Sequence, residues 1–156
     1  MSDTTIKQVL GRRVWDSRGR PTVEAEVHLT GGAIGRAIAP AGASTGSGEA
    51  LDLRDGGEKL GGFDVRTAVD NVNIQIADAL AGMDATDQTL VDQSLIALDG
   101  TPNKRMLGGN ASIAASMAVL QAAAAAHNMP LWRYLARKNE ITMPLPEIQI
   151  FGGGAH

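Results

Sequence analysis

Cysteine is missing from this chain of 156 residues, and aromatic residues are scarce: two tryptophans, two phenylalanines and one tyrosine. Without cysteine the chain forms no disulfide bond and no thiolate metal site, which fits a reducing compartment. An excess of positive charge is also missing, because 14 lysines and arginines face 17 aspartates and glutamates, for a net charge of -3. A nucleic acid or an anionic membrane surface is therefore not expected as a partner.

Long hydrophobic runs are missing as well. The first eight residues are polar and lack the apolar stretch of about 7–15 residues that a signal peptide needs. The alanine-rich run over 111–126 is interrupted by Ser112, Ser116 and Gln121, and it falls short of the roughly 20 apolar residues that span a bilayer. We therefore expect a cytoplasmic protein without membrane insertion. Its length suits one globular domain of about 100–200 residues.

Alternation of apolar and polar residues predicts a strand over 22–29. Its apolar positions are Val23, Ala25, Val27 and Leu29, and its polar positions are Thr22, Glu24, Glu26 and His28. Runs over 6–15 and 33–39, set off by turn residues, predict two more strands joined by hairpins. Glu24 and Glu26 have the spacing of paired catalytic carboxylates, but the alternation places them on a wet face, so we expect them to be solvated.

Helical periodicity follows the glycine pairs at 56–57 and 61–62. Asp64 is the expected N-cap of the first helix, and the small residues on nearly every side of the third predict a central position. We expect His127, at the end of that third helix, to have a structural role. The four expected helices run from 64 to 80, from 86 or 87 to 99, from 110 to 127, and from 130 to 135.

The segment Met143-Pro144-Leu145-Pro146 cannot continue a helix and indicates an extended linker. One more strand is expected over 147–151, followed by three glycines. Strands first and helices afterwards, without βαβ alternation, predict an α+β domain.

Four segments then carry a family resemblance. In chain order they are Asp16-Ser17-Arg18-Gly19, Gly42-Ala43-Ser44-Thr45-Gly46, Leu98-Asp99-Gly100-Thr101-Pro102-Asn103-Lys104 and Gly152-Gly153-Gly154-Ala155-His156. Their order resembles the N-terminal part of enolase, and the resemblance covers the whole chain. It implies that residues 1–142 form the enolase N-terminal cap, a three-stranded antiparallel sheet followed by helices. Residues 143–156 would be the linker and the first strand of a (β/α) barrel whose remainder is missing from the sequence.

Enolases dehydrate 2-phosphoglycerate to phosphoenolpyruvate with Mg²⁺ as cofactor. By resemblance, Ser44 lies in a mobile loop, formed by Gly42, Ala43, Ser44, Thr45 and Gly46, and lends oxygen ligands to Mg²⁺. His156 would bind the substrate and act in proton transfer, and Arg18 would attract the anionic substrate. The resemblance also implies a homodimer or higher homo-oligomer. Since the base and the metal carboxylates of the family lie in the barrel, the 156 residues alone are expected to be inactive.

Departures from the family pattern keep alternatives open. Gly152 stands where asparagine is usual, Ala41 where serine is common, Gly109 where alanine is usual and Ser112 where an aliphatic residue is common. A divergent or non-catalytic enolase-like cap, serving interaction or oligomerisation, is the main alternative.

Arg18 and Ser44 each have an alternative interpretation that does not involve an enolase site. Arg18 could simply stabilise its turn through Asp16. The segment 42–46 also matches the G-x-S-x-G elbow of hydrolases, with Ser44 as nucleophile. That elbow requires a buried parallel strand before it and a helix directly after it, and the sequence favours neither.

Overall fold

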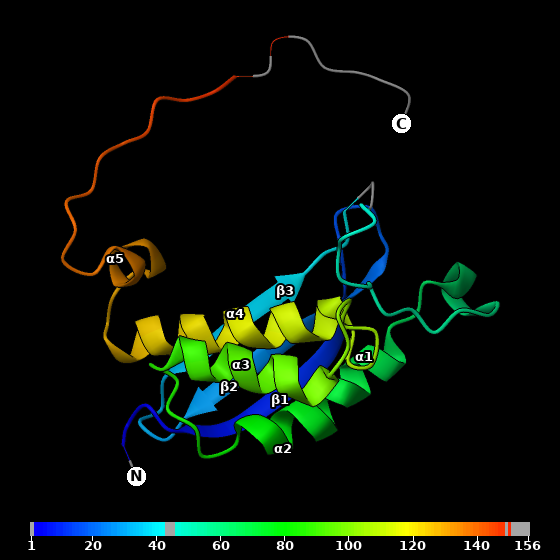
Figure 1. Cartoon of the computed structure of the whole chain (residues 1–156), viewed down its shortest axis with the longest axis horizontal. Coiled ribbons are helices and arrows are strands. Elements are labelled where there is room, and N and C mark those ends of the chain that lie inside the picture. The colour runs from blue at the N-terminus through cyan, green and yellow to red at the C-terminus, as the bar shows by residue number, and fades with distance from the viewer. Residues whose placement is uncertain (1, 43–45, 149, 151–156) are drawn as a thin grey trace.

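A three-stranded antiparallel sheet with helices packed on one face forms the domain (Figure 1). The computed structural model describes residues 2–42, 46–148 and 150. The strands are β1 (Ile6–Trp15), β2 (Pro21–Leu29) and β3 (Ile34–Ala39), in the order β1-β2-β3. The three predicted strands and the α+β class are confirmed.

The apolar side of β2 faces the helices as predicted, and Val23, Ala25 and Val27 are fully buried. The expectation for Glu26 on the other side is wrong, because only 4% of this residue is exposed. β2 is the central strand, so its polar side chains have neighbours on both sides rather than an open edge. The carboxylate of Glu26 lies 2.7 Å from His28 Nε2 and 3.2 Å from Arg12 Nη2, and it also accepts a hydrogen bond from Arg36. The hydrogen bond to His28, followed by that to Arg36, lowers the pKa of Glu26 to about 2.

Seven helical segments follow the sheet within the described part of the chain. They are η1 (Lys59–Gly62), α1 (Arg66–Asn71), η2 (Val72–Ile76), α2 (Ala77–Leu80), α3 (Gln88–Asp99), α4 (Gly109–Ala126) and α5 (Leu131–Ala136). The segments α1, η2 and α2 are continuous and make up the first predicted helix, with a π-helical turn in its middle. In this turn Asn73 accepts from the backbone N–H of Gly11, at 2.9 Å, and donates to the Gly11 carbonyl, at 3.0 Å. The irregular turn thereby ties the helix to β1.

The prediction of Asp64 as the helix N-cap is wrong. The side chain of Asp55 caps α1 instead, since its two oxygens accept from the backbone N–H groups of Arg66, at 2.7 Å, and Thr67, at 3.0 Å. The carboxylate of Asp64 is engaged by Arg13, at 2.7 Å, and this bond is the largest cause that lowers the pKa of Asp64 to about 2. The loop that contains Asp55 therefore reaches over the start of α1.

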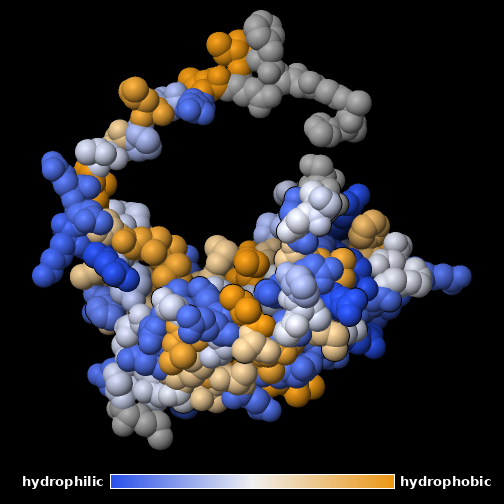
Figure 2. Space-filling model, viewed as in Figure 1, coloured by the Kyte–Doolittle hydropathy of each residue, from blue (hydrophilic) through white to orange (hydrophobic). Residues whose placement is uncertain are grey.

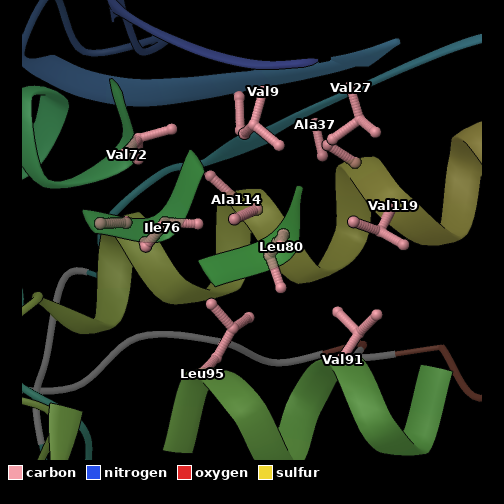
Figure 3. Close-up of a cluster of buried hydrophobic side chains, with 14 of the residues drawn as sticks. Val9, Val27, Ala37, Val72, Ile76, Leu80, Val91, Leu95, Ala114 and Val119 are labelled. Carbon is pink, nitrogen blue, oxygen red and sulfur yellow. The ribbon is translucent and has the colours of Figure 1, made fainter. Parts of the chain in front are cut away.

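The helix α4 forms the centre of the domain, as its small residues predict. A Cβ at Gly35 of β3 would lie 2.2 Å from the backbone carbonyl oxygen of Ala118, so helix and strand are in direct backbone contact. Figure 3 shows Ala114 and Val119 of α4 beside Val27 and Ala37 of the sheet. By length and composition α4 could cross a membrane, but 61% of it is buried inside the domain, as in the core helix of a soluble fold.

His127 is the C-cap residue of α4, which fits the structural role expected for this histidine. Its Nδ1 lies 2.9 Å from the carbonyl oxygen of Ala123, which is one of the last carbonyls of the helix. After α5 the chain runs away from the domain, and residues 140–148 form no helix or strand (Figure 1). The strand expected over 147–151 is not formed by Glu147, Ile148 or Ile150, because no other described strand lies beside them to pair with.

Candidate functional site

The turn between β1 and β2 lies against the segment that follows β3. The carboxylate of Asp16 accepts from the backbone N–H groups of Arg20, at 2.8 Å, and Arg18, at 2.9 Å, and these bonds, that of Arg20 foremost, lower the pKa of Asp16. The guanidinium of Arg18 lies 3.8 Å from the Asp16 carboxylate, so Arg18 forms a long ion pair within its own turn. It also donates to the carbonyl oxygen of Ala41. Arg18 thus contacts Ala41, which lies two residues before the segment 43–45.

Of the predicted site residues, Ala43, Ser44, Thr45 and His156 lie outside the described residues, and so does Gly152. The flanks of the loop are described. The backbone N–H of Gly46 donates to Glu49 Oε1 at 2.7 Å, and the backbone N–H of Glu49 donates to the Gly46 carbonyl at 3.2 Å. Arg18 therefore holds the chain just before the loop, and Glu49 holds it just after.

A pocket of about 590 Å³ opens beside these flanks, between the end of β3, the segment 49–54 and the start of α4. Its charged side chains are Arg20, Glu49, Asp52 and Arg54. Apolar side chains of Ile38, Ile113 and Met117 form much of the remaining wall. Figure 2 shows apolar residues exposed among polar ones over α3 and α4.

Each charged group of the pocket is engaged by a neighbour, and Arg54 and Asp52 pair with each other. Arg54 lies 2.6 Å from Asp52 Oδ2 and donates to the carbonyl oxygen of Phe63 at 2.9 Å. The guanidinium of Arg20 lies 4.7 Å from the centroid of the Phe63 ring, as in a cation–π contact. These contacts hold the rim of the pocket together and make Arg54 a structural residue.

Within the described ranges, no three aspartate, glutamate, histidine or cysteine side chains lie close enough to hold a metal ion. The described residues therefore do not fit a complete Mg²⁺ site by themselves. Since Mg²⁺ is bound by several oxygen ligands, such a site would need groups beyond the described part of this chain.

The hydrolase interpretation of Ser44 requires a parallel strand before the motif and a helix after it, and the described residues form neither. The preceding strand β3 is antiparallel and lies at the edge of the sheet. Residues 46–58 form no helix. A nucleophile elbow needs both a parallel strand and a helix, so the surroundings of the motif do not suit this chemistry.

Three departures from the family pattern lie within the described residues. A Cβ at Gly109 would lie 2.8 Å from the Cβ of Ala50, so glycine lets the segment after the loop approach the start of α4. The residue Ser112 is only 8% exposed, and its hydroxyl has no hydrogen-bond partner among the described residues. Ala41 accepts the hydrogen bond of Arg18 through its backbone carbonyl, which any residue would supply.

Sequence reasoning missed the polar residues that hold this region together, namely Glu49, Asp55 and Asn110. The sequence predicts Asn110 only as the start of a helix, whereas in the structure its side chain bonds to the backbone of Leu53. A signal for Asn110 was present in the sequence: it follows Gly108 and Gly109, which leave room for another segment beside the first turn.

The comparison with known families agrees with the fold and with these motifs. The family model described as "Enolase, N-terminal domain" matches residues 6–135, from the first residue of β1 into α5. The match covers the whole sheet and the helices packed on it. The chain therefore belongs to the enolase family, as an enolase N-terminal domain.

Proposed function

We propose that this domain serves a phosphopyruvate hydratase, the Mg²⁺-dependent lyase of glycolysis that dehydrates 2-phosphoglycerate to phosphoenolpyruvate. The activity requires a (β/α) barrel to complete the site. The observation that carries the proposal is the contact of Arg18 with Ala41, which brings the first family motif against the loop of the second, in a domain of the enolase family. The same proposal includes a cytoplasmic location and a homodimer or higher homo-oligomer.

In this proposal Ser44 supplies oxygen ligands to Mg²⁺, since a hydroxyl and a carbonyl oxygen suit a hard cation. Bound Mg²⁺ would stabilise the negative charge that develops on the substrate carboxylate. The guanidinium of Arg18 attracts the phosphate and carboxylate groups, because it is permanently charged and about 41% of its side chain is exposed. The imidazole of His156 donates to the phosphate or moves a proton near neutral pH. Gly42 and Gly46 give the loop the freedom to close over the substrate.

The first test is the intact mass of the protein as isolated, followed by an assay of phosphoenolpyruvate formation with and without Mg²⁺. A species heavier than 16.2 kDa by about 27 kDa, the mass of a typical barrel, is expected to form product only with Mg²⁺. If that heavier species binds Mg²⁺ and forms no product, the proposed function is wrong.

A matched pair of variants then tests the role of Ser44. Ser44→Ala is expected to lower kcat/KM by about 10–100-fold, because a metal ligand is lost. Ser47→Ala changes an exposed hydroxyl three residues further on and is expected to leave the kinetics unchanged. Equal kinetics of the two variants would show that the Ser44 hydroxyl is not a ligand.

A second candidate function is that of a non-catalytic interaction module. The exposed apolar residues beside the pocket favour it, since Ile113 is 52% exposed, and Ile38 and Met117 are 43% exposed. Sedimentation velocity of the 16.2 kDa chain would show concentration-dependent association if this face binds another copy. A monomer at high concentration would count against this candidate.

A further inference from the structure

The segment 46–54 follows the loop of Ser44 and contains no helix or strand, yet it is held firmly against the domain. Asn110, in the first turn of α4, bonds to both backbone groups of Leu53. Its Oδ1 accepts from the Leu53 N–H at 3.3 Å, and its Nδ2 donates to the Leu53 carbonyl at 3.1 Å. The side chain of Asn110 thus pairs with Leu53 as a neighbouring strand would.

Two backbone bonds continue this attachment at Leu51. Its N–H donates to the carbonyl oxygen of Asn103 at 2.7 Å, and its own carbonyl accepts from the N–H of Gly109 at 2.7 Å. The turn that presents Asn103 is built around the buried carboxylate of Asp99, which accepts from the backbone N–H of Leu107 at 2.7 Å. The family motif over 98–104 therefore has a structural role: through the carbonyl oxygen of Asn103 it holds the segment 46–54 at Leu51.

The attachment rests on a rigid element. Asn110 is only 5% exposed, and α4 packs directly on the sheet through Gly35. Gly109 lets the segment approach, because any Cβ there would meet Ala50 at 2.8 Å. Functional groups on loops keep their geometry only when the residues behind them are locked in place by packing and hydrogen bonds.

We infer that Asn110 is a positioning residue: it fixes the segment 51–53 and, through Glu49 and Gly46, the downstream end of the loop that contains Ser44. Arg18 holds the upstream end through Ala41. The kinetic consequence of this inference rests on the proposed function, whereas its structural part does not. Asparagine is required because alanine offers neither bond, and aspartate offers an acceptor but no donor.

Residue-resolved amide hydrogen exchange of the whole chain tests the structural part. Asn110→Ala is expected to speed exchange at Leu51, Leu53 and Gly46 by about tenfold or more, which corresponds to the loss of one to two net hydrogen bonds. Asn110→Asp is also expected to speed exchange at these amides, because it keeps the acceptor but places a carboxylate oxygen against the Leu53 carbonyl oxygen. Asn103→Ala serves as the control, because only its backbone carbonyl is used. Unchanged protection at Leu51 and Gly46 in folded Asn110→Ala would overturn the inference.

Steady-state kinetics of the barrel-containing protein test the functional part, well below the melting temperature of each variant. Asn110→Ala is expected to lower kcat by about tenfold to 100-fold, since small displacements of reacting groups are costly, and to raise the Mg²⁺ concentration needed for half-maximal activity. Asn110→Asp should lower kcat as well, because it lacks the donor to the Leu53 carbonyl oxygen. Normal kinetics together with lost amide protection would overturn the inference. An inactive wild-type protein would instead refute the proposed function, and the exchange experiment would still decide whether Asn110 positions the segment.

Discussion

Ser112 and Ser116 lie one turn apart on α4, and both line a pocket of about 280 Å³ between α3 and α4. The Ser116 hydroxyl donates to Asp92 Oδ1 at 2.7 Å and accepts from Gln88 Nε2 at 3.0 Å. The Ser112 hydroxyl is buried without a partner among the described residues. The two hydroxyl groups therefore have opposite effects on the free energy of unfolding: that of Ser116 stabilises the domain and that of Ser112 destabilises it. The reason is that a buried polar group stabilises only when it is paired.

Substitution of each serine by alanine tests this difference. Ser112→Ala is expected to raise the unfolding free energy by about 1 kcal/mol and the Tm by about 3 °C, because an unpaired hydroxyl is removed. Ser116→Ala is expected to lower the unfolding free energy by about 1–2 kcal/mol. Thermal and urea unfolding measure both changes. A Ser112→Ala variant less stable than the wild type would show that its hydroxyl has a partner, such as a buried water.

The lowered pKa of Glu26 predicts how the free energy of unfolding depends on pH. Its pKa in the folded domain is about 2, below the ordinary value of 4.5, so its stabilising effect is complete above about pH 4.5 and is lost as the pH falls towards 2. Glu26→Gln should lower the unfolding free energy at pH 7 by about 2 kcal/mol, and the difference from the wild type should close over this acid range. Urea unfolding between pH 2 and 7 tests it.

Glu24→Gln is the control for that experiment. Glu24 lies on the same face of β2, but it has Arg12 as its one ion-pair partner among the described residues, so a loss below about 1 kcal/mol is expected at pH 7. A constant difference between Glu26→Gln and the wild type from pH 7 to 2 would mean that the carboxylate charge does not stabilise the fold.

At the scale of elements, the contact between β3 and α4 depends on a position without a side chain. A Cβ at Gly35 would lie 2.2 Å from both the Ala118 carbonyl oxygen and the Ala122 nitrogen, and backbone atoms cannot rotate away as a side chain does. The sheet and the helix would have to separate. In β3 the small residues Gly35 and Ala37 are buried, whereas Ile34 and Ile38 are exposed, so the residue types of this strand give no sign of the close approach.

Gly35→Ala is therefore expected to destabilise the domain by about 3 kcal/mol or more. Gly48→Ala is the matched control, because no heavy atom lies within 4 Å of its Cβ position and its φ is not positive. A change within about 0.5 kcal/mol is expected there. Thermal unfolding of both variants tests the prediction, which a Gly35→Ala variant of wild-type stability would contradict.

At the scale of the whole molecule, the folded unit ends soon after α5. Met143 is 93% exposed and Leu145 is 92% exposed, in a segment without helix or strand. Removal of residues 141–156 should therefore change the Tm by less than about 2 °C, because the described residues of this segment are all exposed. Differential scanning calorimetry of the shortened and the complete chain measures this. A clear fall in Tm would show that the tail packs on the domain, and the boundary predicted near residue 142 would then be wrong.

Local pattern was sufficient for the three strands and the long helices of this fold, but not for η1, the π-helical turn or the segment after α5. The predicted strand over 6–15 coincides with β1, and the helix predicted over 110–127 differs from α4 by one residue at each end. The central place of α4 also followed from its small residues. These features depend on neighbours three or four residues away at most, which the sequence displays directly. The family motifs added Arg18 and the loop over 42–46 as predicted site residues, and these stay predictions.

What the sequence by itself determined is thus the class of the domain, the order of its elements and its family. Only the tertiary structure decided which polar groups pair. Glu26 is buried because β2 lies between two strands, Asp55 displaces Asp64 as the cap of α1, and Asn110 holds Leu53, which is 57 positions away in the chain. The physical reason is that periodicity tells which side of an element a residue faces, whereas a hydrogen-bond partner depends on which distant segment the fold brings to that side.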